Sequence, residues 1–177
     1  MASTRIVSII GRKDAGKTTL MVALASELIR RGHRVMTIKH GHHPAEVDRS
    51  GSDSWRHLHE GGAERVLLAG PGLRVLFDRA PDEYDPVGLA RRYLADADIV
   101  MVEGFKRAPI PKIEVHRRVT GPAPLLSADS PDAARWLAIV TDDLDLEASC
   151  RVIHFQDTMW MQLLATIAFD QAQVIEP

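Results

Sequence analysis

The chain has 177 residues, of which 45% are hydrophobic and 26% are charged, a composition typical of a globular protein of about one domain. Its 22 lysine and arginine residues and 24 aspartate and glutamate residues give a formal net charge of −2. This balance argues against a general nucleic-acid-binding protein, which carries a basic excess. The single cysteine, Cys150, excludes an internal disulfide and a zinc site built from cysteines. We therefore expect one domain over residues 1–177 and no nucleic-acid partner.

The apolar runs of the chain are short. Ile6–Ile10, near the N-terminus, is too short to be the apolar core of a signal peptide. No run reaches the roughly 20 residues that a membrane-spanning helix needs. Because a single cysteine also suits a reducing compartment, the sequence predicts a cytoplasmic protein with no membrane partner.

The first forty residues predict a strand, a loop, a helix and a second strand. Ile6–Ile10 is rich in β-branched residues and is followed by glycine, as buried strands often are. A helix is expected from about Lys17 to Arg31, where apolar residues recur at helical spacing and Gly32 provides a stop. A second strand follows at Arg34–Lys39. This order is that of a βαβ unit, whose strands are parallel.

The rest of the chain continues to alternate between strands and helices. The expected strands are Arg65–Ala69 and Leu73–Phe77, joined as a hairpin by Gly70–Pro71–Gly72, then Ile99–Val102, Lys112–His116, Trp136–Val140 and Arg151–His154. The expected helices are Ser52–Gly61, with Ser52 as N-cap, Asp85–Ala95 and Asp157–Phe169, and the expected surface loop is Gly121–Asp132. The pattern favours one α/β domain with a mostly parallel, mixed sheet.

The strongest motif is the loop Gly11–Thr18, which matches G-x-x-x-x-G-K-[ST] between the first strand and the first helix. Its glycines allow backbone N–H groups to face one anion, and the helix adds its dipole. Lys17 would reach the outer phosphates and the Thr18 hydroxyl would bind Mg²⁺. The expected nucleotide-binding residues of this loop are Gly11, Asp14, Ala15, Gly16, Lys17, Thr18 and Thr19. The motif predicts the three-layer fold of P-loop NTPases, the alternative being a glycine turn with a solvated lysine.

Other polar residues follow the expected strands and should meet at the edge where parallel strands end. Glu103 ends the strand Ile99–Val102 and is our candidate for the carboxylate on the metal side, in preference to Asp98 at the start of that strand. Asp48, in the loop after the second strand, is a further candidate metal ligand. Thr141 and Asp142 follow the strand Trp136–Val140, where Asp142 would accept from a purine base or serve as a turn residue.

Histidines cluster after the second strand, at His40, His42 and His43. Neutral imidazoles bind zinc, but these three lack a cysteine and a clear ligand spacing. We therefore expect them to contact an anion or the substrate, ahead of a solvated loop and of a metal site.

Several motifs together resemble the MobB family, molybdopterin-guanine dinucleotide biosynthesis protein B. They are Gly11–Leu20, Ile38–His43, Gly51–His57, Gly62–Ala63, Val102–Lys106, Pro111–Arg117 and Ala138–Asp142. The resemblance keeps this order over residues 5–142. It departs from the family at Ser50–Asp53, where relatives often carry Pro-Gly-Lys-Asp.

The resemblance implies a P-loop GTPase of low activity that uses GTP and Mg²⁺, with molybdopterin as a further ligand. It implies a homodimer that assists a molybdopterin guanylyltransferase of the MobA type, the enzyme that attaches GMP to molybdopterin. Gly16, Lys17 and Thr18 would then bind phosphate and Mg²⁺, and Glu103 would supply the metal-side carboxylate. The resemblance also implies that the loop characteristic of the family is lined by His40, His42, His43, Asp48, Asp53 and Arg56.

The expected catalytic residues are Lys17, Glu103 and Arg56. Hydrolysis should be slow, because the sequence shows no clear arginine finger in the same chain and no glutamine to position water. Arg56 is the candidate for the arginine finger. GTP is preferred over ATP only by the resemblance, since Thr141–Asp142 lacks the stronger Asn-Lys-x-Asp pattern. A small-molecule kinase and a nucleotide- or pterin-binding adaptor without turnover are the alternatives. Gly121–Asp132 contains no lysine or arginine, which argues against a kinase lid.

Overall fold

The computed structural model describes residues 3–41, 48–79, 85–127, 130 and 132–176. The chain divides into two compact units, residues 1–40 with 85–177 and residues 41–84. Its length predicts a single domain. The division arises because residues between the second strand and the third helix build a two-stranded sheet of their own.

The first unit is built on a seven-stranded sheet with the order β2-β5-β1-β6-β7-β8 and with β9 paired to β1. The parallel strands are β1 (Thr4–Gly11), β2 (Val35–Lys39), β5 (Ile99–Glu103), β6 (Lys112–His116), β7 (Trp136–Thr141) and β8 (Arg151–His154). The antiparallel strand β9 (Gln173–Ile175) makes the sheet mixed. The predicted mostly parallel α/β fold is confirmed. The sequence did not indicate β9, because three residues carry no readable alternation.

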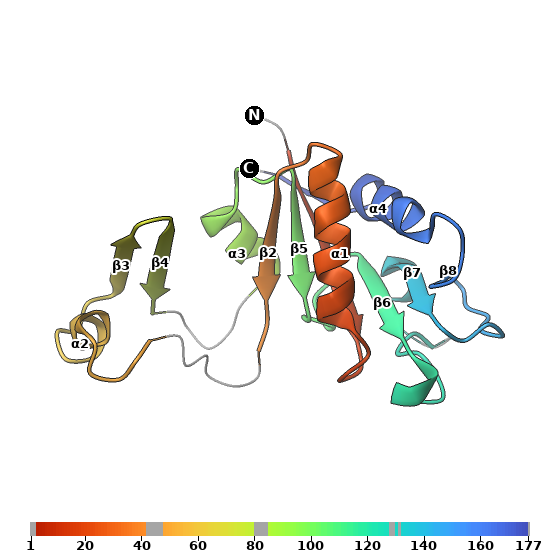
Figure 1. Cartoon of the computed structure of the whole chain (residues 1–177), viewed down its shortest axis with the longest axis horizontal. Helices are drawn as coiled ribbons and strands as arrows, with labels where there is room; N and C mark the ends of the chain where they lie inside the picture. Colours follow the sequence, from red (N-terminus) through yellow and green to blue (C-terminus); the bar gives the residue numbers. More distant parts are fainter. Residues whose placement is uncertain (1–2, 42–47, 80–84, 128–129, 131, 177) are drawn as a thin grey trace. The chain divides into compact units, whose positions relative to one another are not determined.

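Helices cover both faces of this sheet. On one face α1 (Lys17–Arg30) lies beside α4 (Trp160–Asp170), as Figure 1 shows, and α1 buries Leu24 and Leu28 against the sheet. On the other face α3 (Pro86–Tyr93) places Ala90 among the sheet residues of a second core cluster. Helix α3 is shorter than the predicted Asp85–Ala95 at both ends, because Asp85 serves as its N-cap and Leu94 as its C-cap. The helices and the sheet form the predicted three layers.

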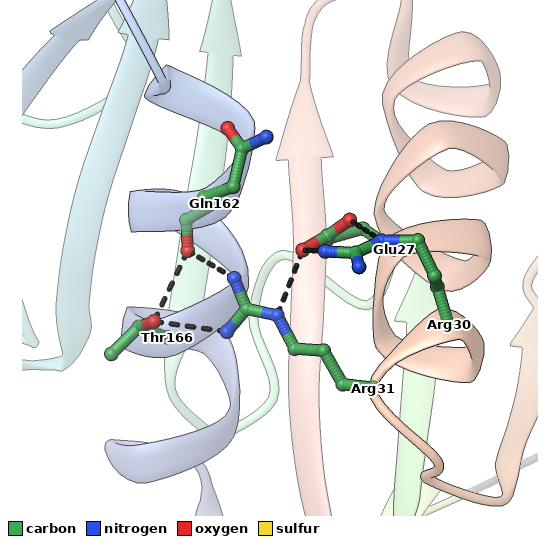
Figure 2. Close-up of polar contacts among 5 residues, drawn as sticks. All are labelled: Glu27, Arg30, Arg31, Gln162 and Thr166. Atoms are coloured by element: carbon green, nitrogen blue, oxygen red, sulfur yellow. Dashed lines mark hydrogen bonds and ion pairs between the residues drawn. The ribbon is translucent and has the colours of Figure 1, made fainter.

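An arginine at the end of α1 ties this helix to α4. Arg31 donates to the backbone oxygen of Gln162 at 2.6 Å and to the Thr166 hydroxyl at 2.9 Å, and it also contacts Glu27 at 2.8 Å (Figure 2). Glu27 accepts two further bonds from Arg30. These bonds, from Arg30 first and then Arg31, lower the pKa of Glu27 to about 2. The paired arginines at the helix end therefore hold a carboxylate and a neighbouring helix, as well as suiting the helix dipole.

Strand β6 has the predicted bounds and buries polar side chains. Its alternation of polar and apolar residues is typical of a half-buried strand, yet all five residues are buried between β1 and β7. Lys112 donates to Asp132 at 2.9 Å, and Glu114 accepts from the backbone of Leu125 and Leu126 and from the indole of Trp136. These charges are buried because each has fixed partners. The stretch predicted as a surface loop therefore supplies part of the cover over β6.

The second unit holds α2 (Asp53–His59) and the antiparallel hairpin of β3 (Arg65–Gly70) and β4 (Leu73–Asp78). Ser52 caps α2 by accepting from the backbone of Trp55 at 3.2 Å, as predicted. Four leucines of the hairpin are between 45% and 68% exposed: Leu67, Leu68, Leu73 and Leu76. Among the described residues of both units, no helix is long and apolar enough to cross a membrane.

Candidate functional site

The loop after β1 has the backbone that its glycines predict. Gly11 has φ 152°, and a Cβ there would lie 2.5 Å from the backbone oxygen of Val115 on β6. Gly16 has φ 94° at the start of α1, and Asp14 also has a positive φ of 62°. Ala15 is buried between them. Glycine is therefore required at Gly11 by both conformation and space, so that the strand can turn directly into the loop.

Thr18 and Glu103 meet at the start of α1. The Thr18 hydroxyl lies 2.9 Å and 3.0 Å from the two Glu103 carboxylate oxygens. Glu103 is the last residue of β5, where it pairs in register with Ile9 of β1 and Lys39 of β2. The two residues predicted for the metal side thus contact each other, and their metal role stays a prediction.

The oxygens of Thr18 and Glu103 suit a hard cation. Mg²⁺ in nucleotide sites binds one or two protein oxygens and takes its other ligands from phosphate and water. Asp98, the alternative candidate for the metal-side carboxylate, directly precedes β5 at its opposite end. It accepts a hydrogen bond from the backbone N–H of Arg34 at 2.7 Å. It serves as an anchor for the chain entering β2, as its position at the strand start suggested.

Lys17 lies folded over its own loop. Its ammonium donates to the backbone oxygen of Arg12 at 2.7 Å. Arg12 in turn donates to the backbone oxygen of Ala123 at 3.4 Å. Thr19, the next candidate, is exposed on the first turn of α1. A bound phosphate would offer the Lys17 ammonium a stronger, charged acceptor than this carbonyl.

Ser8 and Gly104 fix the place of Glu103, and the sequence did not indicate either of them as a site residue. The Ser8 hydroxyl donates to the backbone oxygen of Gly104 at 2.6 Å, and the Gly104 N–H donates to the backbone oxygen of Ile9 at 3.0 Å. Gly104 has φ 101°, and a Cβ there would lie 3.2 Å from the Cβ of His40. The polar Ser8 inside an apolar strand was the available signal.

His40 packs against the turn that follows β5. Its N–H donates to the backbone oxygen of Glu103 at 3.0 Å, and its ring lies 4.4 Å from that of Phe105. The structure thus gives His40 a packing role beside the metal-side carboxylate, and its predicted contact with an anion stays a prediction. The predicted sites His42 and His43 lie outside the described residues.

Thr141 and Asp142 end β7 at the same edge of the sheet. Thr141 is fully buried and its hydroxyl accepts from the backbone of Asp143 at 3.0 Å. Asp142 accepts from the backbone of Arg118 at 2.9 Å, and its other oxygen lies 3.6 Å from the Arg117 guanidinium. Thr141 therefore shapes the turn, while the Asp142 carboxylate is engaged by the Arg118 backbone N–H and the Arg117 guanidinium.

The remaining candidates belong to the second unit. Asp48 accepts from the hydroxyls of Ser52 at 2.7 Å and Ser54 at 3.1 Å, which ties it to the start of α2. Arg56 pairs with Glu60 at 2.9 Å, and both line an open pocket together with Asp53. The metal role of Asp48 and the catalytic role of Arg56 stay predictions.

Within the described part of the chain, no three or more histidine, cysteine or acidic side chains are grouped so as to hold a metal ion. A magnesium ion held mostly by phosphates and water needs no such group, so this finding leaves the pair Thr18 and Glu103 as a fitting site.

Residues 6–142 match the family described as "Molybdopterin guanine dinucleotide synthesis protein B". The chain is 42% identical over 121 residues to the molybdopterin-guanine dinucleotide biosynthesis adapter protein of Haemophilus influenzae, an alignment covering 67% of each chain. It is 39% identical to the Escherichia coli protein of the same description, covering 62% of this chain and 63% of that one. These alignments thus span about two thirds of the relatives' lengths.

The fold is also similar to solved structures. A crystal structure of molybdopterin-guanine biosynthesis protein B matches with a TM-score of 0.63 and 26% identity, covering 92% of this chain and 95% of that chain. Bacillus subtilis MobB matches with a TM-score of 0.64 and 21% identity, covering 93% and 98%, which shows a shared fold.

Proposed function

We propose a function from two premises: the chain belongs to the molybdopterin guanine dinucleotide synthesis protein B family, MobB, and Thr18 of its glycine-rich loop contacts Glu103 at the carboxyl edge of the sheet. We infer that the protein is an adapter of molybdopterin guanine dinucleotide biosynthesis and that it binds GTP with Mg²⁺. The observation that carries the nucleotide proposal is the contact of Thr18 with both Glu103 oxygens at the start of α1.

The site would bind the nucleotide by charge neutralisation and fixed geometry. The loop from Gly11 and the first turn of α1 present backbone N–H groups and the positive end of the helix dipole to the phosphates. Lys17 would leave the Arg12 carbonyl and bind the outer phosphates. Thr18 and Glu103 would hold Mg²⁺, which would offset the negative charge of the phosphates.

We propose slow hydrolysis for this site and, separately, a catalytic role for Arg56 of the second unit. The parts assembled in the first unit bind and neutralise phosphate, and none of those described is a base that activates water. Pterin is the second ligand that the family's described pathway suggests, and the histidines after β2 are its proposed contacts.

We propose that the adapter acts as a homodimer alongside a molybdopterin guanylyltransferase. The hairpin of β3 and β4 supports the dimer, because a lone two-stranded sheet is marginally stable and its edges are open to pairing. Apolar side chains lie on both of its faces, since Leu67 pairs with Leu76 and Leu68 pairs with Val75. A second copy of the hairpin would cover such residues symmetrically.

The test is titration calorimetry of the purified protein with GTP and with ATP, each with Mg²⁺. Lys17→Ala should reduce GTP binding at least about a hundredfold, the loss expected for a desolvated cation on phosphate. Lys13→Ala, which removes an exposed cation from the same loop, is the matched control and should change binding less than about threefold.

Equal loss in the two variants would mean that general charge, and not a built phosphate site, attracts the nucleotide. Equal binding of ATP and GTP would favour the kinase alternative, and would direct the search to a phosphate acceptor. Intact GTP binding without phosphate release would favour an adapter that does not turn over its nucleotide.

A further inference from the structure

Three residues that directly follow neighbouring parallel strands meet at one corner of the first unit. Arg117 follows β6, Asp142 follows β7 and Phe155 follows β8. The last residues of these strands pair in register, so that His116 lies beside Thr141 and Thr141 lies beside His154. We call Arg117, Asp142 and Phe155 the β6–β8 corner.

The contacts within this corner are specific. The Arg117 guanidinium carbon lies 4.3 Å above the Phe155 ring, and its Nη1 lies 3.6 Å from an Asp142 carboxylate oxygen. Phe155 is fixed from two sides: its N–H donates to the backbone oxygen of Thr141 at 3.1 Å, and its ring meets that of Trp160 edge to face at 5.5 Å. The corner therefore presents a fixed ring and a carboxylate that together hold one planar cation.

The corner lies within reach of a nucleotide in the phosphate loop. Strand β6 adjoins β1 at Gly11 and pairs with β7 on its other side. Two strand spacings amount to about 10 Å along the carboxyl edge. That separation suits a nucleoside triphosphate whose phosphates occupy the loop and whose base lies over the end of β7.

A guanidinium and a guanine base present the same features to such a corner. Both are planar, both stack on an aromatic ring, and both offer adjacent N–H donors to a carboxylate. Guanine supplies these donors from N1 and from the exocyclic N2 amine. Adenine places an unprotonated ring nitrogen at the corresponding position, which a carboxylate repels.

We propose that the Arg117 guanidinium and a guanine base compete for Phe155 and Asp142, so that guanine must displace the arginine from them. This proposal rests on the proposed function, because it names the base-reading part of the same nucleotide site. The site then selects a ligand whose own N–H groups can face the Asp142 carboxylate in place of those of Arg117. The apparent affinity is reduced by the fraction of molecules in which Arg117 fills the subsite.

This proposal predicts an effect opposite to that of simple electrostatics. Removing a cation near a phosphate site should weaken nucleotide binding if the cation only attracts phosphates. If Arg117 competes with the base, removing it should strengthen the binding of guanine nucleotides and leave ATP weak. Arg118 is the matched control, since it is the adjacent cation and its guanidinium lies 3.7 Å from Asp143, away from the Phe155 ring.

The experiment is titration calorimetry of the full chain with GDP, guanosine and ATP, using the wild type, Arg117→Ala, Arg117→Lys and Arg118→Ala. Arg117→Ala should lower the dissociation constants of GDP and guanosine by about threefold to tenfold, from the loss of one ion pair and one cation–π contact. Arg117→Lys, which keeps the charge without the planar fork, should show a smaller gain. Arg118→Ala should leave guanosine binding unchanged.

Weaker or unchanged guanosine binding in Arg117→Ala would overturn the proposal, and Arg117→Lys decides the matter if the alanine variant does not fold. Asp142→Asn and Phe155→Leu should each weaken guanosine binding, and normal binding in both would also overturn it. These failures are separate from that of the proposed function: a wild type that binds GTP through Lys17 but shows no gain in Arg117→Ala refutes only the subsite. A wild type that binds no guanine ligand refutes both.

Discussion

The two halves of the carboxyl edge differ in how their functional atoms are held. At the ends of β5 and β1, Glu103 and Thr18 already face each other, and Ser8 and Gly104 fix the turn behind them. At the ends of β6 to β8, the carboxylate of Asp142 is engaged by Arg117 and Arg118. In the half that we propose for phosphate, the polar side chains thus contact each other, while in the half that we propose for the base, the carboxylate contacts other groups of the chain.

This difference has a physical origin. The Thr18 hydroxyl and the Glu103 carboxylate can form a hydrogen bond to each other, because a hydroxyl is a good donor to a carboxylate. A carboxylate beside an aromatic ring attracts any planar cation, and the chain supplies one from the next strand. Removing a cation should therefore act with opposite signs in the two halves: Lys17→Ala should weaken nucleotide binding, and Arg117→Ala should strengthen it.

The largest effect is expected at the turn from β1 into the loop. Gly11→Ala would force a Cβ to within 2.5 Å of the Val115 carbonyl at a strained φ, and should lower the free energy of unfolding by about 3 kcal/mol. GTP binding should be lost with it. Urea unfolding measures the first effect and calorimetry the second.

Gly70→Ala is the control for this substitution, since a Cβ there would make only ordinary contact at 3.8 Å. A Gly11→Ala protein as stable as the Gly70→Ala protein would show that the close approach of loop and β6 does not exist in solution.

A smaller effect is expected at the metal-side carboxylate. Glu103→Gln keeps the shape and the contact with Thr18 but removes the charge, and should weaken Mg²⁺-dependent GTP binding by on the order of tenfold or more. Binding measured with EDTA should change little, because the charge acts through the metal. The readout is the ratio of GTP affinities with and without Mg²⁺.

Asp98→Asn tests the assignment from the opposite end of the same strand. It should leave the Mg²⁺ ratio unaltered, because Asp98 holds the backbone of Arg34. If Asp98→Asn lowered the ratio and Glu103→Gln did not, the two carboxylates would have to exchange roles.

The smallest effect concerns the link between the two halves. Glu27 and Arg31 join α1, which follows the phosphate loop, to α4, which follows β8 and the corner (Figure 2). The pKa of Glu27 is lowered from 4.5 to about 2 by the bonds from Arg30 and Arg31. Its stabilising contribution is present above pH 4.5 and is lost as the pH falls from 4.5 toward 2, since the unfolded chain takes up the proton first.

Glu27→Gln should therefore flatten the fall in stability over that pH range, as followed by the urea midpoint at pH 5 and pH 3. Glu60→Gln, which breaks an exposed pair with Arg56 in the second unit, is the control. An identical pH dependence in wild type and Glu27→Gln would contradict the ion-pair network.

Much of the fold was readable from local pattern. The strand–loop–helix of the first thirty residues, the Ser52 cap and the Gly70–Gly72 hairpin turn depend on residues close in sequence, and all three are confirmed. The pairing of Thr18 with Glu103 was also predictable, because parallel strands end at one edge. Element ends were less accurate: α4 starts at Trp160 instead of Asp157, where a left-handed Met159 precedes it.

The polar residues of β6 show where local pattern misled. Lys112, Glu114 and His116 alternate with apolar residues, and the pattern cannot tell a solvent-facing row from a buried row with partners. The partners, Asp132 and the backbone of Leu126 among them, come from a stretch read as a surface loop. Arg117 and Phe155 directly follow strands, as Asp142 does, and that position was the available signal for them.

The glycine-rich loop motif, the parallel sheet and the family could all be predicted from the sequence, because each depends on residue types at fixed short spacings. Which charges are buried, that the chain divides into two units, and that Arg117 lies on Phe155 beside Asp142 became clear only from the three-dimensional structure. These outcomes depend on contacts between residues tens of positions apart, whose geometry is set by strand order and register and not by local propensity.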